Sequence, residues 1–220
     1  MLRRVQLIVW DWNGTVVADS RAHLAATNSF IRLLGGREVS LTELQAEFGL
    51  PVREFYLGRG CDPGRLITEV GHWYEAYERL SSNIALRRGV RIILCVQRRR
   101  RRQNWILSNN TVGSIERQLD RLQVSHFFRE LSANCGQLDV VVAATKLDRL
   151  RELLAQYSRY QPHQVVIIGD SLEEIEIAQA LGATSIAVGG GVCSIERLKA
   201  AEPDILLGSL EPIARVLATM

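Results

Sequence analysis

The sequence lacks several features that would assign a chain to a specialised class of protein. No apolar run approaches the roughly 20 residues of a membrane-spanning helix, so we expect no membrane partner. The four cysteines lie far apart and form no CxxC pair, which argues against both a zinc site and a disulfide framework. Such cysteine usage fits a reducing compartment, and we expect a cytoplasmic protein. No internal repeat is visible, and nothing indicates an oligomeric state.

Lysine is scarce, and acidic residues are missing from one long interval. The chain has 25 arginines but only two lysines, one of which is Lys146. No acid occurs between Glu78 and Glu116, where nine arginines lie. Outside this interval 18 basic residues face 24 acids, so the formal net charge of +3 comes from one local block.

The most concentrated part of this block is the run Arg98–Arg102. Clustered arginines attract phosphates, but no aromatic residues interleave with these five as they do in a base-stacking surface. Arginines at this point would also complement the C-terminal dipole of a helix that precedes the second strand. We therefore favour a solvated helix end over a nucleic-acid site, with an anionic partner as the alternative.

What is present is an alternation of short apolar runs with amphipathic segments. Continuous apolar runs indicate strands that are covered on both faces. Strand–helix alternation predicts an α/β fold with a doubly wound, Rossmann-like parallel sheet. The predicted strands span residues 5–11, 104–109, 127–133, 164–170, 184–190 and 204–209.

Residues 19–86 interrupt this alternation with helical patterns and no strand. The stretch SRAHLAATNSFIRLLGG is typical of a helix that ends at a glycine pair, and Ser40 and Glu43 form a capping-box pattern. We therefore predict an α/β core domain of residues 1–18 and 87–220, and a helical cap domain of residues 19–86. An insertion with two chain crossings is well placed to act as a lid.

Polar side chains follow several predicted strands, at the edge where parallel α/β sheets bind ligands. Asp11 ends the first strand, Ser108 and Asn109 end the second, and Asp170 ends the fourth. Lys146 begins the helix before the fourth strand. Carboxylates at such an edge suit a hard cation such as Mg²⁺, and an ionised aspartate can attack phosphorus to form an aspartyl-phosphate.

Four motifs in this order resemble those of the haloacid dehalogenase-like superfamily of phosphohydrolases, in particular its phosphoglycolate-phosphatase-like type. They are Asp11-Trp12-Asn13-Gly14-Thr15, ILSN with Ser108, Lys146, and IIGDSLEE with Asp170 and Glu174. The resemblance covers nearly the whole chain, and the predicted cap lies where that family carries its specificity domain.

The resemblance implies a nucleophilic role for Asp11 and a phosphate-binding role for Ser108 and Lys146, with Asn109 and Gly14 beside them. The implied substrate is a small phosphorylated metabolite, of the phosphoglycolate or sugar-phosphate class. Which one is decided by the cap and is not readable from the sequence.

The resemblance also implies a Mg²⁺ site made by Asp11, Asp170, Glu174 and the backbone carbonyl of Asn13. Glu174 stands where the family usually has Asp. Ser171 and Glu174 also match a capping box, which is an alternative explanation of that glutamate.

Asn13 is the main departure from the family pattern. Phosphatases of this family usually have a second aspartate here, which protonates the leaving oxygen and then activates water. General acid–base assistance contributes about 10²–10⁴-fold, so we predict a slow phosphatase that prefers good leaving groups. The alternatives are a non-catalytic member that binds phosphate or a partner, and a hydrolytic dehalogenase, which uses an aspartate nucleophile without the second acid.

Three further expectations concern residues near this site. Glu173 is expected to face solvent. His23 is expected to be an ordinary residue on a helix surface, although related sugar-phosphate mutases have a histidine in this neighbourhood. Trp73, Tyr74 and Tyr77 are expected in the core of the cap rather than against a substrate.

Overall fold

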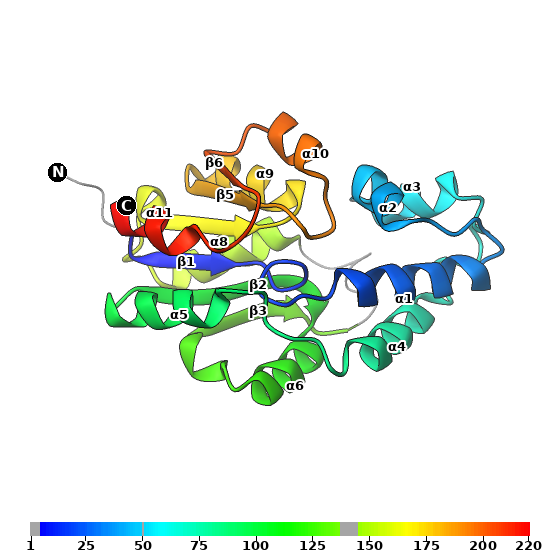
Figure 1. Cartoon of the computed structure of the whole chain (residues 1–220), viewed down its shortest axis with the longest axis horizontal. Helices are drawn as coiled ribbons and strands as arrows, with labels where there is room; N and C mark the ends of the chain where they lie inside the picture. Colours follow the sequence, from blue (N-terminus) through cyan, green and yellow to red (C-terminus); the bar gives the residue numbers. More distant parts are fainter. Residues whose placement is uncertain (1–4, 50, 137–144) are drawn as a thin grey trace.

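The computed structural model describes residues 5–49, 51–136 and 145–220 (Figure 1). Within these ranges the centre is a six-stranded, all-parallel sheet with the strand order β3-β2-β1-β4-β5-β6. The strands are β1 (Leu7–Trp10), β2 (Gln103–Thr111), β3 (Glu130–Asn134), β4 (Val165–Gly169), β5 (Thr184–Val188) and β6 (Ile205–Leu207). The predicted doubly wound α/β fold is confirmed, and each strand overlaps its predicted interval.

The strand order reverses beside β1. The chain proceeds from β1 outward to β2 and β3, and then returns to β4 on the other side of β1. Trp10 of β1 pairs with Ile168 of β4, so the two strands end side by side. Such a reversal opens a crevice beyond the strand ends, where ligands of parallel α/β proteins bind.

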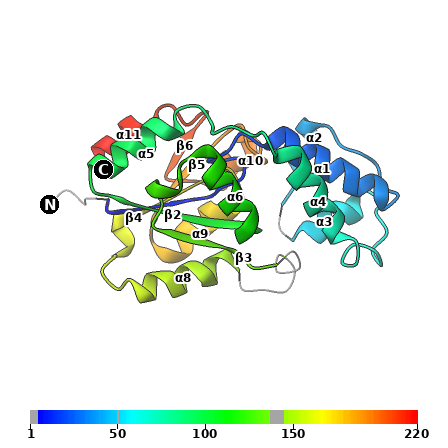
Figure 2. The same cartoon turned by 90° about the horizontal axis from the view of Figure 1, so that it is seen from below.

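Helices cover both faces of the sheet, which explains why the strands are apolar throughout. Alternate residues of β1 point to opposite faces. One face packs on α5 (Val90–Arg99), α6 (Val112–Leu122) and α11 (Ile213–Thr219). The other packs on α8 (Lys146–Gln156) and α9 (Leu172–Leu181), and α10 (Ile195–Ala200) extends this layer. Figure 2 shows α5 and α11 on one side of the sheet and α8 on the other. No described helix is long and apolar enough to cross a bilayer.

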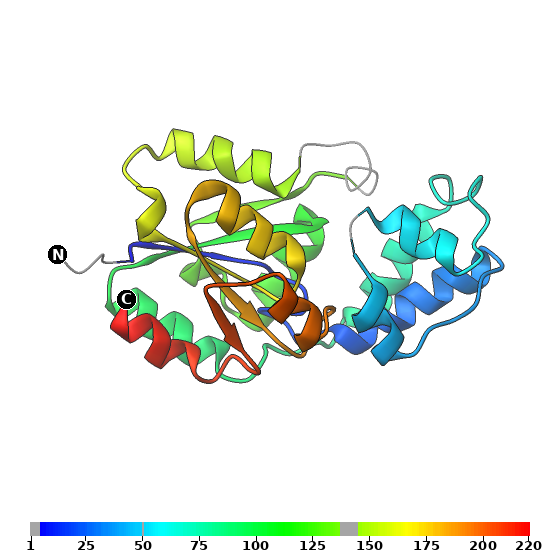
Figure 3. The ribbon, with the colours of Figure 1, turned by 90° about the horizontal axis from the view of Figure 1, so that it is seen from above.

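The described part of the interval 19–86 forms a group of helices with its own apolar core. The helices are α1 (Ser20–Leu33), α2 (Leu41–Glu47), α3 (Val52–Gly58) and α4 (Val70–Ser81). Phe30, Leu44 and Phe55 are among the buried residues of this core, and the predicted capping box of Ser40 and Glu43 is present at α2. Figures 1 and 3 show these helices at one end of the molecule and the chain termini at the other. The boundaries 1–18, 87–220 and 19–86 stay predictions.

The arginine run lies at the end of α5, as predicted, and joins this helix to β2. The expectation of a solvated helix end holds for Arg98–Arg101, which are exposed, and is wrong for Arg102, which is buried. Helix α5 ends at Arg99, and Arg101 has a left-handed backbone conformation with φ 58°. Arg100 and Arg102 donate to the backbone oxygen of Leu217, at 3.3 and 2.7 Å. Two of the five arginines therefore bind a carbonyl in the last turn of α11, which otherwise has no partner within its helix.

Candidate active site

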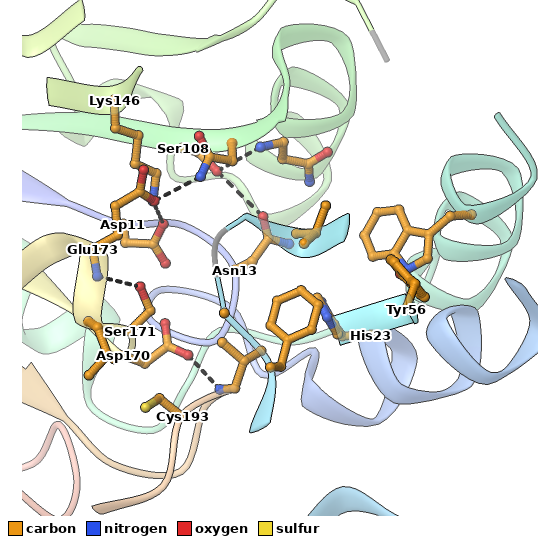
Figure 4. A pocket seen from close by; sticks show the side chains of 18 of the residues that line it. Asp11, Asn13, His23, Tyr56, Ser108, Lys146, Asp170, Ser171, Glu173 and Cys193 are labelled. Carbon is orange, nitrogen blue, oxygen red and sulfur yellow. Dashed lines mark hydrogen bonds and ion pairs between the residues drawn. The ribbon is translucent and has the colours of Figure 1, made fainter. Parts of the chain in front are cut away.

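Lys146 lies in a buried, charged cluster at the carboxyl edge of the sheet (Figure 4). Its Nζ atom is 2.8 Å from Oδ1 of Asp11, 2.5 Å from Oε1 of Glu174 and 3.4 Å from Oε2 of Glu173. Thr145 caps α8, so the helix begins at Lys146 and directs this residue toward β1. The structure thus brings together side chains that are up to 163 positions apart in the sequence.

The charges of this cluster shift one another's protonation. Burial alone would lower the pKa of Lys146, but the three neighbouring carboxylates raise it well above its ordinary value. Burial raises the pKa of Asp11 well above its usual range, with Lys146 opposing this and Glu174 and Asp170 adding to it. Lys146 therefore stays charged. A further cation close to Asp11 would favour the ionised form of its carboxyl group.

Glu174 is held behind Lys146. Burial alone would raise the pKa of Glu174, but Lys146 keeps it below its ordinary value. Its second oxygen accepts a hydrogen bond from Oγ of Ser171 at 2.6 Å. A Cβ atom at Gly169 would lie 2.2 Å from Cγ of Glu174, so only glycine leaves room for this side chain. Both carboxylate oxygens of Glu174 are engaged by side chains, and its role at a metal stays a prediction.

Asp170 follows β4 and is fixed at both oxygens. Oδ1 accepts from the hydroxyl of Thr15 and Oδ2 from the backbone N–H of Val192, each at 2.7 Å. Two glycines make the approach possible, since a Cβ atom at Gly191 or Gly14 would lie 1.8 or 2.3 Å from Oδ2. Gly14 also has φ +71°, a conformation that other residues rarely adopt.

Replacing Asp170 with asparagine should stabilise the metal-free protein near neutral pH. Burial above all, with Glu174 adding, raises the pKa of Asp170 from 3.8 to about 6, against the hydrogen bonds from Val192 and Thr15. Because the pKa of Asp170 is raised in the folded state, ionisation of this carboxyl group opposes folding. The protein therefore pays no such penalty below about pH 4, and the free energy of unfolding falls as the pH rises through about 6. We expect Asp170→Asn to add roughly 1–3 kcal/mol, or several degrees of Tm, near pH 8 in EDTA.

Thermal unfolding of this variant at about pH 8 and pH 4 measures the effect, which should nearly vanish at the lower pH. Asp120→Asn, at an exposed position of α6, is the control and should change Tm little at either pH. A Tm change that is the same at both pH values would show that ionisation of Asp170 does not oppose folding.

Asn13, in the loop after β1, has its side-chain amide oriented by two neighbours. Its Nδ2 atom donates to Oδ2 of Asp19 at 2.7 Å and to the hydroxyl of Tyr77 at 2.6 Å, and Tyr77 donates to Asp19 at 2.6 Å. The amide oxygen of Asn13 therefore points the other way and lies 3.5 Å from Oγ of Ser108. Toward the cavity Asn13 offers an acceptor and no titratable proton.

The pair of Asp19 and Tyr77 was not expected from the sequence. Asp19 directly precedes α1. Tyr77 lies on α4 and is buried, but it packs in the cluster that includes Trp10 of β1 rather than in the insertion's own core, and its hydroxyl reaches the loop after β1. The other oxygen of Asp19 accepts from the N–H of Gly14 at 2.6 Å. That N–H is therefore engaged within the loop, and the contact of Gly14 with phosphate stays a prediction.

The asparagines after Ser108 differ in what they bind. Asn109 donates to Oε2 of Glu173 at 2.8 Å. The expectation that Glu173 faces solvent is wrong, because Asn109 and Lys146 hold it in the cluster and its side chain is only 17% exposed.

Asn110 is buried, its backbone N–H donates to Oγ of Ser108, and its Nδ2 atom has no partner among the described residues. It was not singled out from the sequence.

These residues line a cavity of about 270 Å³ that extends from the sheet edge to the helical insertion. Its walls include all the predicted site residues except Gly14 and Glu174. Figure 4 shows Asp11, Lys146 and Asp170 at one end and His23 and Tyr56 at the other. Trp73 and Tyr74 also line the cavity, so they are not confined to the core of the insertion.

The expectation that His23 is an ordinary surface residue is wrong. It is 8% exposed, and its ring lies edge-on to Phe48 and Trp73, with centroids 5.0 and 5.3 Å away. Its Nε2 atom has no hydrogen-bond partner among the described residues. Burial lowers the pKa of His23, against the charge of Asp19, which favours the neutral imidazole.

The donor chemistry at the sheet edge fits a magnesium ion. Asp11 and Asp170 are buried carboxylates with raised pKa values, and a divalent cation near them would favour their ionised forms. No group of three His, Cys, Asp or Glu side chains spaced to hold a metal occurs in the described ranges. A cation here would thus keep several water ligands, as Mg²⁺ commonly does.

The sequence model of the haloacid dehalogenase-like hydrolases matches residues 8–188, which include Asp11, Ser108, Lys146 and Asp170. A search of curated proteins finds no match.

Several solved structures resemble the chain over almost its whole length. A haloacid dehalogenase-like hydrolase from Streptococcus pneumoniae has a TM-score of 0.79 and 21% identity, covering 98% of this chain and 100% of that one. A predicted phosphatase from Clostridium acetobutylicum has a TM-score of 0.79 and 16% identity, covering 99% and 100%. A predicted phosphoglycolate phosphatase from Haemophilus somnus has a TM-score of 0.74 and 14% identity, covering 96% and 97%. At these identities the likeness establishes a shared fold.

Proposed function

Because this chain belongs to the haloacid dehalogenase-like hydrolases, we propose that it is a Mg²⁺-dependent phosphatase that hydrolyses a small phosphate monoester through Asp11. The observation that carries the proposal is the buried contact of 2.8 Å between Asp11 and Lys146 at the wall of a cavity. A carboxylate beside an ammonium, open to a ligand, is the arrangement that an anionic substrate and a carboxylate nucleophile both require.

The phosphoryl group is held by donors from two elements, α8 and β2. Lys146 lies beside the nucleophile and neutralises charge on the phosphate, and Glu174 fixes its position. The hydroxyl of Ser108 and Nδ2 of Asn110, which no described residue binds, supply hydrogen bonds to phosphate oxygens, since both residues line the cavity. A Mg²⁺ ion bound by Asp11, Asp170 and the carbonyl of Asn13, with Glu174 as a further predicted ligand, would lower the pKa of Asp11 and add positive charge.

Asn13 limits both chemical steps. In the first step Asp11 attacks phosphorus and the leaving oxygen departs with the bonding electrons, but Asn13 has no proton to give it. In the second step water attacks the aspartyl-phosphate, and the amide oxygen of Asn13 accepts a hydrogen bond without removing a proton. Good leaving groups therefore react first, and the phosphorylated enzyme accumulates because its hydrolysis lacks a general base.

A second candidate function is phosphate binding without turnover. It is favoured by the same amide, whose two donated hydrogen bonds to Asp19 and Tyr77 hold it in a form that cannot act as an acid. The two candidates differ in whether any phosphoryl transfer to Asp11 occurs.

The experiment is hydrolysis of acetyl phosphate and p-nitrophenyl phosphate by the wild-type protein, in excess Mg²⁺ and in EDTA. Both compounds have good leaving groups, and acetyl phosphate needs little room beyond the phosphate. We expect slow release of phosphate in Mg²⁺, at least about 10-fold above the rate in EDTA. Rates at background with both compounds would reject the phosphatase and favour the binding protein.

A further inference from the structure

The part of the cavity that the helical insertion lines is mostly apolar. We call this part the apolar chamber, and its walls include Phe30, Phe48, Val52, Tyr56, Val70 and Trp73. All these residues come from the helical insertion, and none of the described insertion residues that line the cavity is Asp, Glu, Lys or Arg. The same wall holds the buried Nε2 atom of His23, which has no hydrogen-bond partner within the described part of the chain.

Charged residues of the cavity wall come from the α/β core, and the two described cations among them, Lys146 and Arg197, contact other groups of the protein. Lys146 contacts three carboxylates. Arg197, on α10, donates its Nη1 atom to the backbone oxygens of Gln45 and Phe48, at 3.2 and 2.6 Å. Inside the apolar chamber, a second negative charge on the substrate, such as a carboxylate beside its phosphate, would lie against aromatic rings. Burying an unpaired charge is strongly unfavourable.

We propose that the substrate is an aryl phosphate, whose phosphate lies at Asp11 and whose uncharged aromatic ring occupies the apolar chamber. This inference rests on the proposed phosphatase function and adds the chemical class of its leaving group. Edge-on and stacked contacts with Phe48 and Trp73 suit a flat ring, and a polar substituent on it would meet Nε2 of His23. A cavity of about 270 Å³ is slightly smaller than the usual small-molecule site of about 300–1,000 Å³, and it fits a compact ligand.

Asn13 supports the same class by an independent route. An aryl oxygen departs as a phenolate, which needs less help from an acid than an alkoxide does. The bond from Asp11 to phosphorus forms as the aryl oxygen–phosphorus bond breaks. The phenolate keeps the electron pair and takes its proton from solvent. A phenolate leaving group thus suits this site in two ways, because it needs little help from a general acid and its ring fits an aromatic chamber.

The test is binding of two phosphonates to the wild-type protein in Mg²⁺, measured by calorimetry. Benzylphosphonate has an uncharged ring, and phosphonoacetate has a carboxylate in its place. We expect benzylphosphonate to bind about 10- to 100-fold more tightly, from burial of the ring. The variant Val70→Arg should reduce this ratio at least about 10-fold, because it places a cation in the chamber wall. Ile92→Arg, at a site on α5 that is 69% exposed, should leave the ratio unchanged.

Binding and turnover together separate this inference from the proposed function. Equal or tighter binding of phosphonoacetate, with acetyl phosphate still hydrolysed, would overturn the aryl assignment and leave the phosphatase intact. If benzylphosphonate binds more tightly but acetyl phosphate and p-nitrophenyl phosphate are hydrolysed only at the background rate, the ring's place in the chamber is supported and the phosphatase is rejected. A ratio that Val70→Arg leaves unchanged would show that the ring binds elsewhere.

Discussion

Replacing Asn13 with aspartate should raise the turnover of p-nitrophenyl phosphate about 10²- to 10⁴-fold, the usual contribution of general acid–base assistance. The amide of Asn13 lies at the cavity wall, with its oxygen 3.5 Å from Oγ of Ser108. A carboxyl group in its place would protonate the leaving oxygen and then remove a proton from water. The gain should be largest in the second step, because the p-nitrophenolate leaves without help.

The surroundings of position 13 also determine the pH dependence of this variant. Nδ2 of Asn13 is 2.7 Å from Oδ2 of Asp19, so the substitution places two carboxyl groups in contact. Two such groups share one proton, and the higher of their two apparent pKa values rises above the ordinary range of aspartate. We expect kcat of Asn13→Asp to reach its maximum nearer neutral pH than an isolated aspartate would allow.

Steady-state kinetics from about pH 5 to 9 measure both effects. The matched control is Asn109→Asp, which adds the same charge to the same cavity at a position with no role in proton transfer. It should not raise kcat. If kcat of Asn13→Asp does not exceed kcat of the wild type, position 13 does not limit turnover.

The second large effect is expected for Asp11→Asn, which should lower the hydrolysis of acetyl phosphate by roughly 10³-fold or more. The amide oxygen of the variant can still accept the hydrogen bond from Lys146, but a neutral amide does not attack phosphorus. Burial raises the pKa of Asp11 in the metal-free protein, so the substitution should leave Tm in EDTA unchanged or higher near neutral pH.

Loss of activity together with an undiminished Tm would identify Asp11 as a functional rather than a structural residue. Asp120→Asn serves again as the control, with wild-type activity expected. If Asp11→Asn retained a substantial share of the wild-type rate, the nucleophile would have to be another group.

The sheet and its polar edge were predictable because both follow from short-range patterns. Apolar runs identified the strands, and in a parallel sheet the side chains that follow the strands meet at one edge. Asp11, Ser108 and Asp170 were found in this way. Lys146 was found because lysine is rare in this chain and this one begins a helix.

The partners of these residues were not predictable, because they depend on how the insertion meets the sheet edge. Tyr77 reaches Asp19 and Asn13 across 58 and 64 positions of sequence. His23 is buried where Phe48 and Trp73, from other parts of the insertion, pack against its ring. Glu173 lies on the first turn of a helix, where an exposed carboxylate is the ordinary expectation, and contact with Lys146 overrides it.

The most direct test of the central claim is mass spectrometry of the wild-type protein after brief incubation with p-nitrophenyl phosphate and Mg²⁺. We predict the mass gain of one phosphoryl group, on the peptide that contains Asp11, and its slow loss once the substrate is removed. The gain should be absent in Asp11→Asn and short-lived in Asn13→Asp. Steady release of p-nitrophenol by the wild type, without any phosphorylated protein and with the same rate in Asn13→Asp, would contradict an aspartyl-phosphate whose hydrolysis is limited by Asn13.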